Sequence, residues 1–87
     1  MGFYLFDPAE FYEFTPEDKA KICAARASGK KNIRNRVEVL ASEQCGCHWC
    51  YRIFPPGEIT DWTDWRDGVY MTPICPRCGV DCVIALN

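Results

Sequence analysis

Cysteine is the residue type in this chain with the most chemical potential, and seven cysteines occur among 87 residues. Most of them fall into two short segments, CGCHWC at 45–50 and CPRCGVDC at 75–82. Thiols at such spacing can hold a metal ion, pair as disulfides or carry out redox chemistry. An odd number of cysteines excludes a complete set of intramolecular disulfides, so a metal site is the leading interpretation.

Two Cys-x-x-Cys pairs have the spacing of zinc knuckles: Cys47 with Cys50, and Cys75 with Cys78. Two intervening residues let a tight turn present both sulfurs to one tetrahedral ion at about 2.3 Å. The second pair is the more specific, because Gly79 follows it and can adopt the positive φ that such a turn favours. Tyr51 holds the matching place after the first pair and is a poorer turn residue. The spacing predicts one structural Zn²⁺ held by four thiolates.

Three further residues are secondary candidates for the metal. Cys45 could form a wider pair with Cys50, Cys82 could replace Cys78, and His48 lies inside the first turn. A histidine within such a turn more often points outward than toward the ion. Cys45 and Cys82 are interpreted as small residues beside the site, able to donate to the ligands or to oxidise with each other.

The same pattern argues against an enzyme. A thioredoxin-like redox centre needs Cys-x-x-Cys at the start of a helix in a βαβ unit, and neither pair has that context. Catalytic zinc needs three protein ligands, a bound water and a general base, whereas four thiolates close the coordination sphere. We expect a non-enzymatic protein.

Helical signals dominate the first half of the chain. Thr15 and Pro16 start a helix that ends near Ser28, before Gly29. A second helix is expected over 33–42, capped by Asn32, with a buried stripe at the i, i+4, i+7 positions: Ile33, Val37 and Leu40. Arg34 is expected to pair with Glu38 across one turn, and Cys23 to be a small buried residue of the first helix. The two helices are expected to form a hairpin.

Strand and turn signals dominate the second half. Strands are expected over 51–54, 69–72 and 83–86, with a turn at Asp67–Gly68 and one helical turn within 58–65 whose inner side carries Ile59 and Trp62. The prediction is one α+β domain spanning 1–87, with an aromatic segment at 1–14, a helical hairpin at 15–43 and a zinc ribbon of three antiparallel strands and two knuckles at 44–87. Six aromatic residues in the first segment are interpreted chiefly as core, and alternatively as a partner-binding anchor.

Charge is unevenly distributed along the chain, although the formal net charge is only −2. Residues 19–36 contain no acid and carry these bases: Lys19, Lys21, Arg26, Lys30, Lys31, Arg34 and Arg36. The acidic start of the chain is unlike a secretory signal, and no apolar run is long enough to span a bilayer. We therefore expect a cytoplasmic protein without a membrane association, in a compartment where thiols stay reduced.

Two segments together resemble a known group of proteins: CGCHWCYRIFPPGEITDW at 45–62 and ICPRCGVDCVI at 74–84. They are similar to the signature of small, uncharacterised bacterial and phage-borne cytoplasmic zinc-ribbon proteins, in which CGC-x-x-C leads to F-P-x-x-EI-x-x-W and the chain ends on CP-x-CG-[IV]-D-S-V-I. The helical segment Asn35–Glu38 adds to the likeness, which covers about 32–86 and leaves the aromatic start unmatched. Cys82 stands where the group has serine, so the resemblance implies that it is not a required ligand. By position it implies a zinc-ribbon fold and the ligands Cys47, Cys50, Cys75 and Cys78, but no activity.

Two functions remain open at this stage. The first is a small regulatory or inhibitory module, of a size typical of phage-encoded regulators, that binds an unidentified protein through exposed aromatics such as Phe3, Tyr4 or Trp65. The alternative is nucleic-acid binding through the basic segment, whose candidate residues are Arg26, Lys30, Lys31, Arg34 and Arg36. The acidic balance, with a sequence pI of about 5.3, favours the protein partner. Homo-oligomerisation is open in either case.

Overall fold

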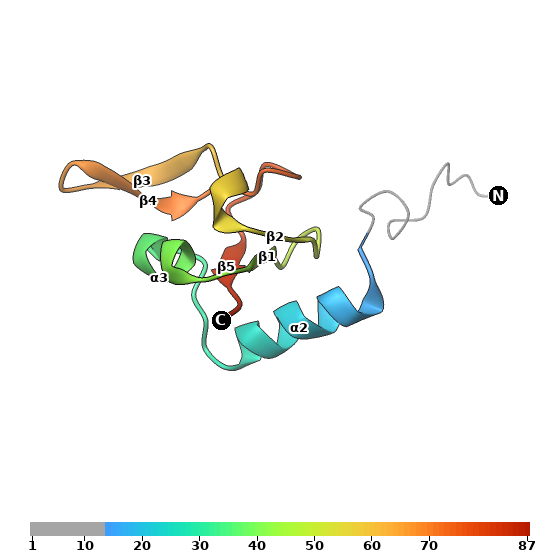
Figure 1. Ribbon diagram of the computed structural model, residues 1–87. Helices are drawn as coiled ribbons and strands as arrows, with labels where there is room; N and C mark the ends of the chain where they lie inside the picture. Colours follow the sequence, from blue (N-terminus) through green and yellow to red (C-terminus); the bar gives the residue numbers. More distant parts are fainter. Residues whose placement is uncertain (1–13) are drawn as a thin grey trace.

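A computed structural model describes residues 14–87. Phe3, Tyr4 and the rest of the predicted aromatic segment before Phe14 lie outside the described residues. The described part is a small α+β structure with two helices, α2 (Pro16–Ala27) and α3 (Arg36–Ala41), a 3₁₀ turn η1 (Pro56–Glu58) and five short strands (Figure 1). None of the helices in this part is long and apolar enough to cross a membrane.

The strands form two separate antiparallel sheets. β1 (Cys45–Cys47) lies in the middle of the first, between β2 (Ile53–Phe54) and β5 (Val83–Ala85). β3 (Trp62–Arg66) and β4 (Val69–Pro73) form the second, a hairpin that extends away from the first sheet (Figure 1). The predicted strands near 51–54, 69–72 and 83–86 thus correspond to β2, β4 and β5, while β1 and β3 were not predicted as strands.

Helix α2 begins and ends as its sequence predicts. The Thr15 hydroxyl accepts a hydrogen bond of 3.1 Å from the Asp18 N–H, and Gly29 follows the helix with φ of +101°. Ile22 is fully buried, but Cys23 is exposed. The prediction of a buried Cys23 is therefore wrong, because neighbouring helical side chains point about 100° apart and Ile22 takes the inward direction.

Helix α3 is shorter than predicted and has a different buried side. It starts at Arg36 because Arg34 has φ of +50°, which a right-handed helix cannot contain. Val39 is the buried residue of the helix. The predicted stripe is wrong, since these residues are exposed by 50%, 74% and 50%: Ile33, Val37 and Leu40.

Asn35 explains the different orientation of α3. Its side chain is almost completely buried, and its amide donates hydrogen bonds to the carbonyl oxygens of Lys31 at 2.7 Å and Val83 at 3.0 Å. Asn35, rather than the predicted Asn32, occupies the residue before the helix. By tying this point to β5, Asn35 fixes which side of α3 faces the core.

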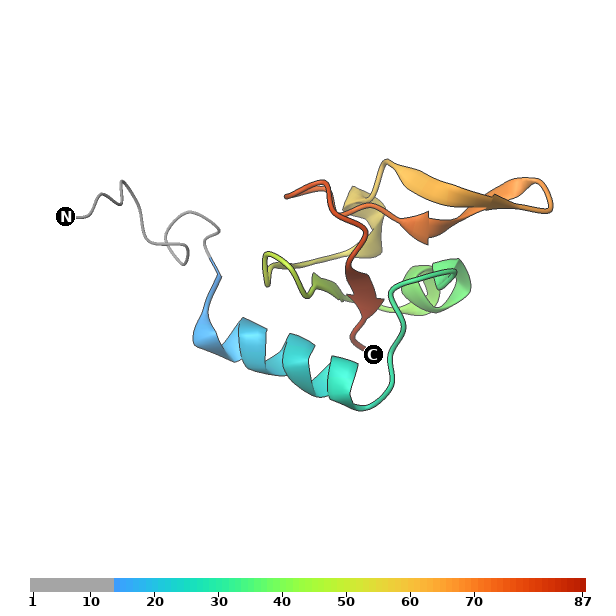
Figure 2. The ribbon, with the colours of Figure 1, turned by 180° about the vertical axis from the view of Figure 1, so that it is seen from behind.

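The two helices pack on opposite faces of the first sheet and do not form the predicted helical hairpin. Ile22 of α2 lies against Gly46, whereas the Cys45 sulfur lies 4.0 Å from the Val39 carbonyl oxygen in α3. Consecutive strand residues point to opposite faces. Both ribbon views accordingly show α3 beside the β3–β4 hairpin and α2 away from it (Figures 1 and 2).

Polar side chains connect α3 and the segment before it to the β3–β4 hairpin. The Asp64 carboxylate accepts hydrogen bonds of 3.2 Å from Arg34, Arg66 and the Thr72 hydroxyl. The Arg36 guanidinium lies 4.5 Å from the centre of the Trp62 ring. Arg34 thus pairs with the hairpin, and the expected partner Glu38 makes no ion pair with it among the described residues.

The predicted helical turn within 58–65 is largely wrong. The single 3₁₀ turn ends at Glu58, and residues from Trp62 onward pair with β4. Ile59 is buried and Trp62 is half-buried, so the inward side was predicted correctly. The Asp67–Gly68 turn is confirmed: both residues have positive φ, at +51° and +93°, as a tight hairpin turn requires.

Candidate metal centre

Four sulfur atoms come together where the first sheet meets its two turns. They belong to Cys47, Cys50, Cys75 and Cys78, and all lie within 4.8 Å of one another. The separation is 3.7 Å between Cys47 and Cys78 and 3.8 Å between Cys50 and Cys75. A regular tetrahedron with metal–sulfur bonds of about 2.3 Å has edges of about 3.8 Å. These distances are much longer than the roughly 2.05 Å of a disulfide, so the geometry is that of a metal site.

The first knuckle is organised by backbone hydrogen bonds around Cys47. The Trp49 N–H points at the Cys47 sulfur at 3.4 Å, and the Tyr51 N–H donates to the Cys47 carbonyl at 2.7 Å. The Cys47 N–H donates to the Arg52 carbonyl at 3.1 Å. Tyr51 adopts the left-handed conformation, with φ of +58°. The turn therefore forms although its last position is not a glycine.

The second knuckle repeats this arrangement around Cys75. The Arg77 N–H points at the Cys75 sulfur at 3.3 Å, and the Gly79 N–H donates to the Cys75 carbonyl at 2.9 Å. The Cys75 N–H donates to the Val80 carbonyl at 2.9 Å, and Gly79 has φ of +80°. Each knuckle thus supplies two sulfurs from the same backbone shape.

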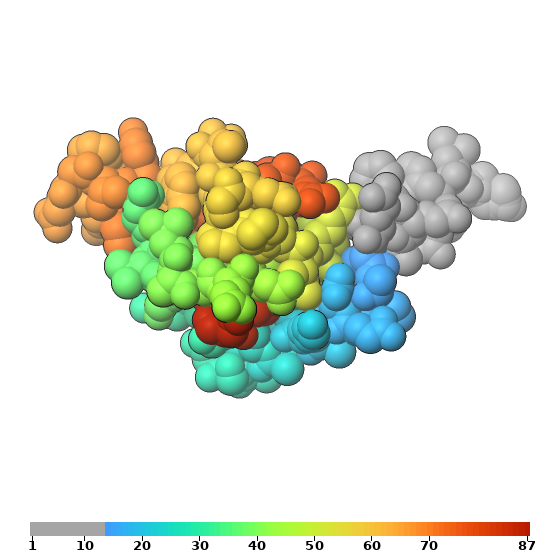
Figure 3. All heavy atoms as spheres, in the orientation of Figure 1, coloured from blue at the N-terminus to red at the C-terminus, as the bar shows by residue number. Residues whose placement is uncertain are grey.

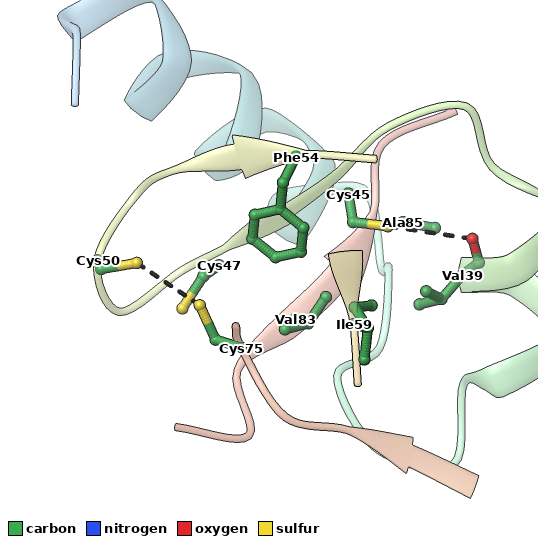
Figure 4. Close-up of a cluster of buried hydrophobic side chains, with 9 residues drawn as sticks. All are labelled: Val39, Cys45, Cys47, Cys50, Phe54, Ile59, Cys75, Val83 and Ala85. Carbon is green, nitrogen blue, oxygen red and sulfur yellow. Dashed lines mark hydrogen bonds between the residues drawn. The ribbon is translucent and has the colours of Figure 1, made fainter. Parts of the chain in front are cut away.

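The site is continuous with the hydrophobic core. Cys47 and Cys50 are fully buried, Cys75 is almost so, and Cys78 is half-buried. Figure 4 shows Cys47, Cys50 and Cys75 pointing toward one another, beside Phe54 and Val83. Solvent therefore has little access to the ligand atoms, as in a closed structural site.

The close approach of the thiols disturbs their acidity. Hydrogen bonds with Cys50 and Cys75, and then burial, raise the pKa of Cys47 far above its ordinary value. For Cys50, the bond with Cys47 lowers the pKa, but the bond with Cys75 and burial outweigh it and raise the pKa to about 12. Hydrogen bonds with Cys47 and Cys50 lower the pKa of Cys75 to about 2. Without a cation the four sulfurs would not all be ionised, because adjacent thiolates repel one another.

The structure leaves the three secondary candidates outside the four-sulfur group. Cys45 is buried against α3, and burial raises the pKa of its thiol to about 11. The backbone N–H of His48 donates to the Cys82 carbonyl at 2.9 Å. Burial, and then the positive charge of Arg26, lower the pKa of the His48 imidazole. The strand pairing sets Cys45 opposite Ala85, so it is not placed opposite Cys82.

The predicted nucleic-acid residues differ in the contacts that they make within the described residues. Arg34 and Arg36 make contacts with the β3–β4 hairpin. Arg26, Lys30 and Lys31 are exposed and make no ion pair within residues 14–87. The basic segment is thus divided between structural and free cations.

Two exposed aromatic positions complete the description of the surface. Trp65 is 59% exposed and meets the Tyr70 ring edge-on, with 4.8 Å between ring centres. Trp49, also 59% exposed, was not among the predicted site residues. Its position between two ligands of a knuckle was the signal available in the sequence, since a residue there must point away from the metal.

Comparison of the chain with models of protein families, with curated proteins and with solved structures gave no significant match. The resemblance to small bacterial and phage zinc-ribbon proteins therefore stays a prediction, and the interpretation of the site rests on its geometry.

Proposed function

We propose that the chain is a non-enzymatic zinc-ribbon module in which Cys47, Cys50, Cys75 and Cys78 hold one structural Zn²⁺. The observation that carries this proposal is the near-tetrahedral grouping of four sulfurs from two knuckles of the same shape. Soft thiolate donors in a tetrahedral set favour zinc over harder divalent ions. A bound zinc would cross-link the two knuckles. It would have a structural and not a catalytic role, because four protein ligands leave no position for a reactive water.

Metal analysis tests this proposal. The purified protein should contain about one zinc per chain, because one set of four ligands is available. Cys75→Ser and Cys78→Ser should lose the metal and much of the folded structure. Cys23→Ser is the matched control: this thiol is exposed and outside the cluster, so zinc content should not change. Zinc-free protein with an unchanged melting temperature would contradict the proposal.

The second part of the proposal is that the module acts by binding another protein, as a small regulatory or inhibitory component of the cytoplasm. The support is the exposed pair Trp65 and Tyr70 on the β3–β4 hairpin. Tryptophan and tyrosine are the residue types that dominate binding energy at protein interfaces. The hairpin that carries the pair is also held in place, since Asp64 accepts a hydrogen bond from Arg34 before α3 and the Arg36 side chain of α3 donates to the Tyr70 carbonyl at 2.9 Å. A preorganised surface loses less entropy on binding.

A quantitative pull-down from the native host tests the protein partner. Trp65→Ala should reduce the recovery of a specific partner at least tenfold, as expected for an interface hot spot. Trp49→Ala is the control, because this tryptophan is equally exposed but lies on the first knuckle. Equal recovery with both variants would show that the hairpin is not the binding surface.

A further inference from the structure

A groove beside the first knuckle is not used by the metal site or by the proposed protein-binding surface. It has a volume of about 520 Å³ and is lined by Arg26 from α2 and by His48, Trp49, Tyr51 and Cys82. Figure 3 shows α2 and the segment of the first knuckle next to each other along this side of the molecule. The groove therefore combines one cationic side chain with three aromatic rings.

The Trp49 backbone and the Tyr51 ring have defined contacts at the groove. The backbone of Trp49 is fixed by its N–H contact with the Cys47 sulfur, while its indole remains 59% exposed. The Tyr51 ring meets Phe14 edge-on at 5.5 Å and has the Lys19 ammonium 5.0 Å from its centre. Exposed rings on a rigid turn are the stacking platforms that single-stranded nucleic acids use, because every base has a flat π-face.

Further cations lie elsewhere along α2. Lys21 and Lys30 line a second hollow of about 420 Å³, which shares no residue with the groove. Among residues 14–87, Lys21, Arg26, Lys30 and Lys31 have no acidic partner within ion-pair distance. Unpaired cations beside a stacking ring fit a ligand with alternating phosphates and bases.

We propose that this groove binds single-stranded nucleic acid, with a base stacked on Trp49 and a phosphate at Arg26. The site differs from the basic surface expected from the sequence, because Arg34 and Arg36 are not part of it. Four thiolates around one Zn²⁺ would carry a net negative charge close by. Binding should therefore be weak, because that charge opposes the attraction between Arg26 and a phosphate, and added salt should weaken it further.

Titration of the zinc-loaded full chain with a short oligothymidylate tests the site, with binding followed by fluorescence anisotropy of the labelled oligonucleotide. Trp49→Ala should weaken binding about tenfold to a hundredfold, the range for loss of one stacked base. Arg26→Gln should also weaken binding and reduce the log–log salt slope by about 0.7, the value for one phosphate contact on a single strand.

Two matched substitutions on the β3–β4 hairpin serve as controls. Trp65→Ala removes an equally exposed tryptophan and Arg66→Gln an exposed arginine, and both lie outside the groove. Both should leave affinity unchanged, and all four variants should keep their zinc. The proposal is overturned if the wild type does not bind at low ionic strength, or if the hairpin variants weaken binding as much as the groove variants. Absence of wild-type binding would leave the proposed protein-binding surface on the β3–β4 hairpin untouched, because that surface uses residues outside the groove.

Discussion

Tyr51 and Gly79 occupy equivalent places in the two knuckles, and both are left-handed, with φ of +58° and +80°. A side-chain-bearing residue in this conformation costs roughly 1–2 kcal/mol. At Tyr51 the cost is offset by the 2.7 Å hydrogen bond to the Cys47 carbonyl and by the ring contacts with Phe14 and Lys19. The metal-binding turn therefore determines the backbone here, even where the residue type does not favour it.

Gly79→Ala tests this interpretation at a residue with no compensating side-chain contacts. The added methyl group meets nothing within 4 Å, so any loss arises from the left-handed backbone. We expect the free energy of unfolding of the zinc-loaded protein to fall by about 1 kcal/mol, measured by chemical denaturation. Gly57→Ala is the control, because Gly57 also has open space around it but no positive φ. An equal effect in both variants would show that backbone strain is not the cause.

At the scale of elements, the docking of α2 depends on one close approach. A Cβ atom at Gly46 would lie 2.5 Å and 2.8 Å from two side-chain carbons of Ile22, which is fully buried. Only glycine in β1 lets the helix come this near to the sheet. The middle residue of the CGC segment is thus a packing residue for α2, while its neighbours face the opposite side of the sheet.

A double-mutant cycle measures this contact. Gly46→Ala should destabilise the protein by about 1–3 kcal/mol through overpacking. Ile22→Val shortens the side chain that meets the new methyl group, and by itself should cost about 0.5–1.5 kcal/mol. The double variant should be more stable than the sum of the two losses predicts, as seen by thermal unfolding with circular dichroism. Simple additivity would contradict direct contact between these positions.

The elements that the sequence predicted well are those with local signals. Thr15, Pro16 and Gly29 bound α2 because capping is a property of a few neighbouring residues. The start of α3 could not be predicted, since it depends on Asn35 reaching Val83, a residue far along the chain. β1 and β3 were missed for a similar reason: β1 has only three residues and ends at the first ligand of a knuckle, and β3 is defined by its pairing with β4.

For the molecule as a whole, the predicted metal site and the core are one structure. The ligand set was predictable because Cys-x-x-Cys spacing is local, and the four sulfurs do come together. The position of these ligands in the fold was not predictable, because β1 runs into the knuckle and its residues do not show the alternating pattern of a strand. Cys47 lies on β1 and Cys75 in the turn that precedes β5, so the site joins segments that are far apart in the sequence. In so small a domain, a bound metal would supply a large part of the folding free energy.

Removal of the metal should therefore unfold the described part of the molecule as one unit. With a strong chelator, the helical signal of α2 and the near-ultraviolet signal of Trp62 and Trp65 should disappear together, because the ligands pack in the same core as Val83 and Phe54.

Protons compete with the metal for thiolates, and the pKa values of Cys47 and Cys50 are raised in the metal-free cluster. Acid should then have the same effect on the metal-loaded protein: stability should be complete at neutral pH and should be lost as the pH falls. A circular dichroism titration of the metal-loaded protein against pH measures this loss. Loss of metal with α2 and the tryptophan signals unchanged would show that the core is stable without it.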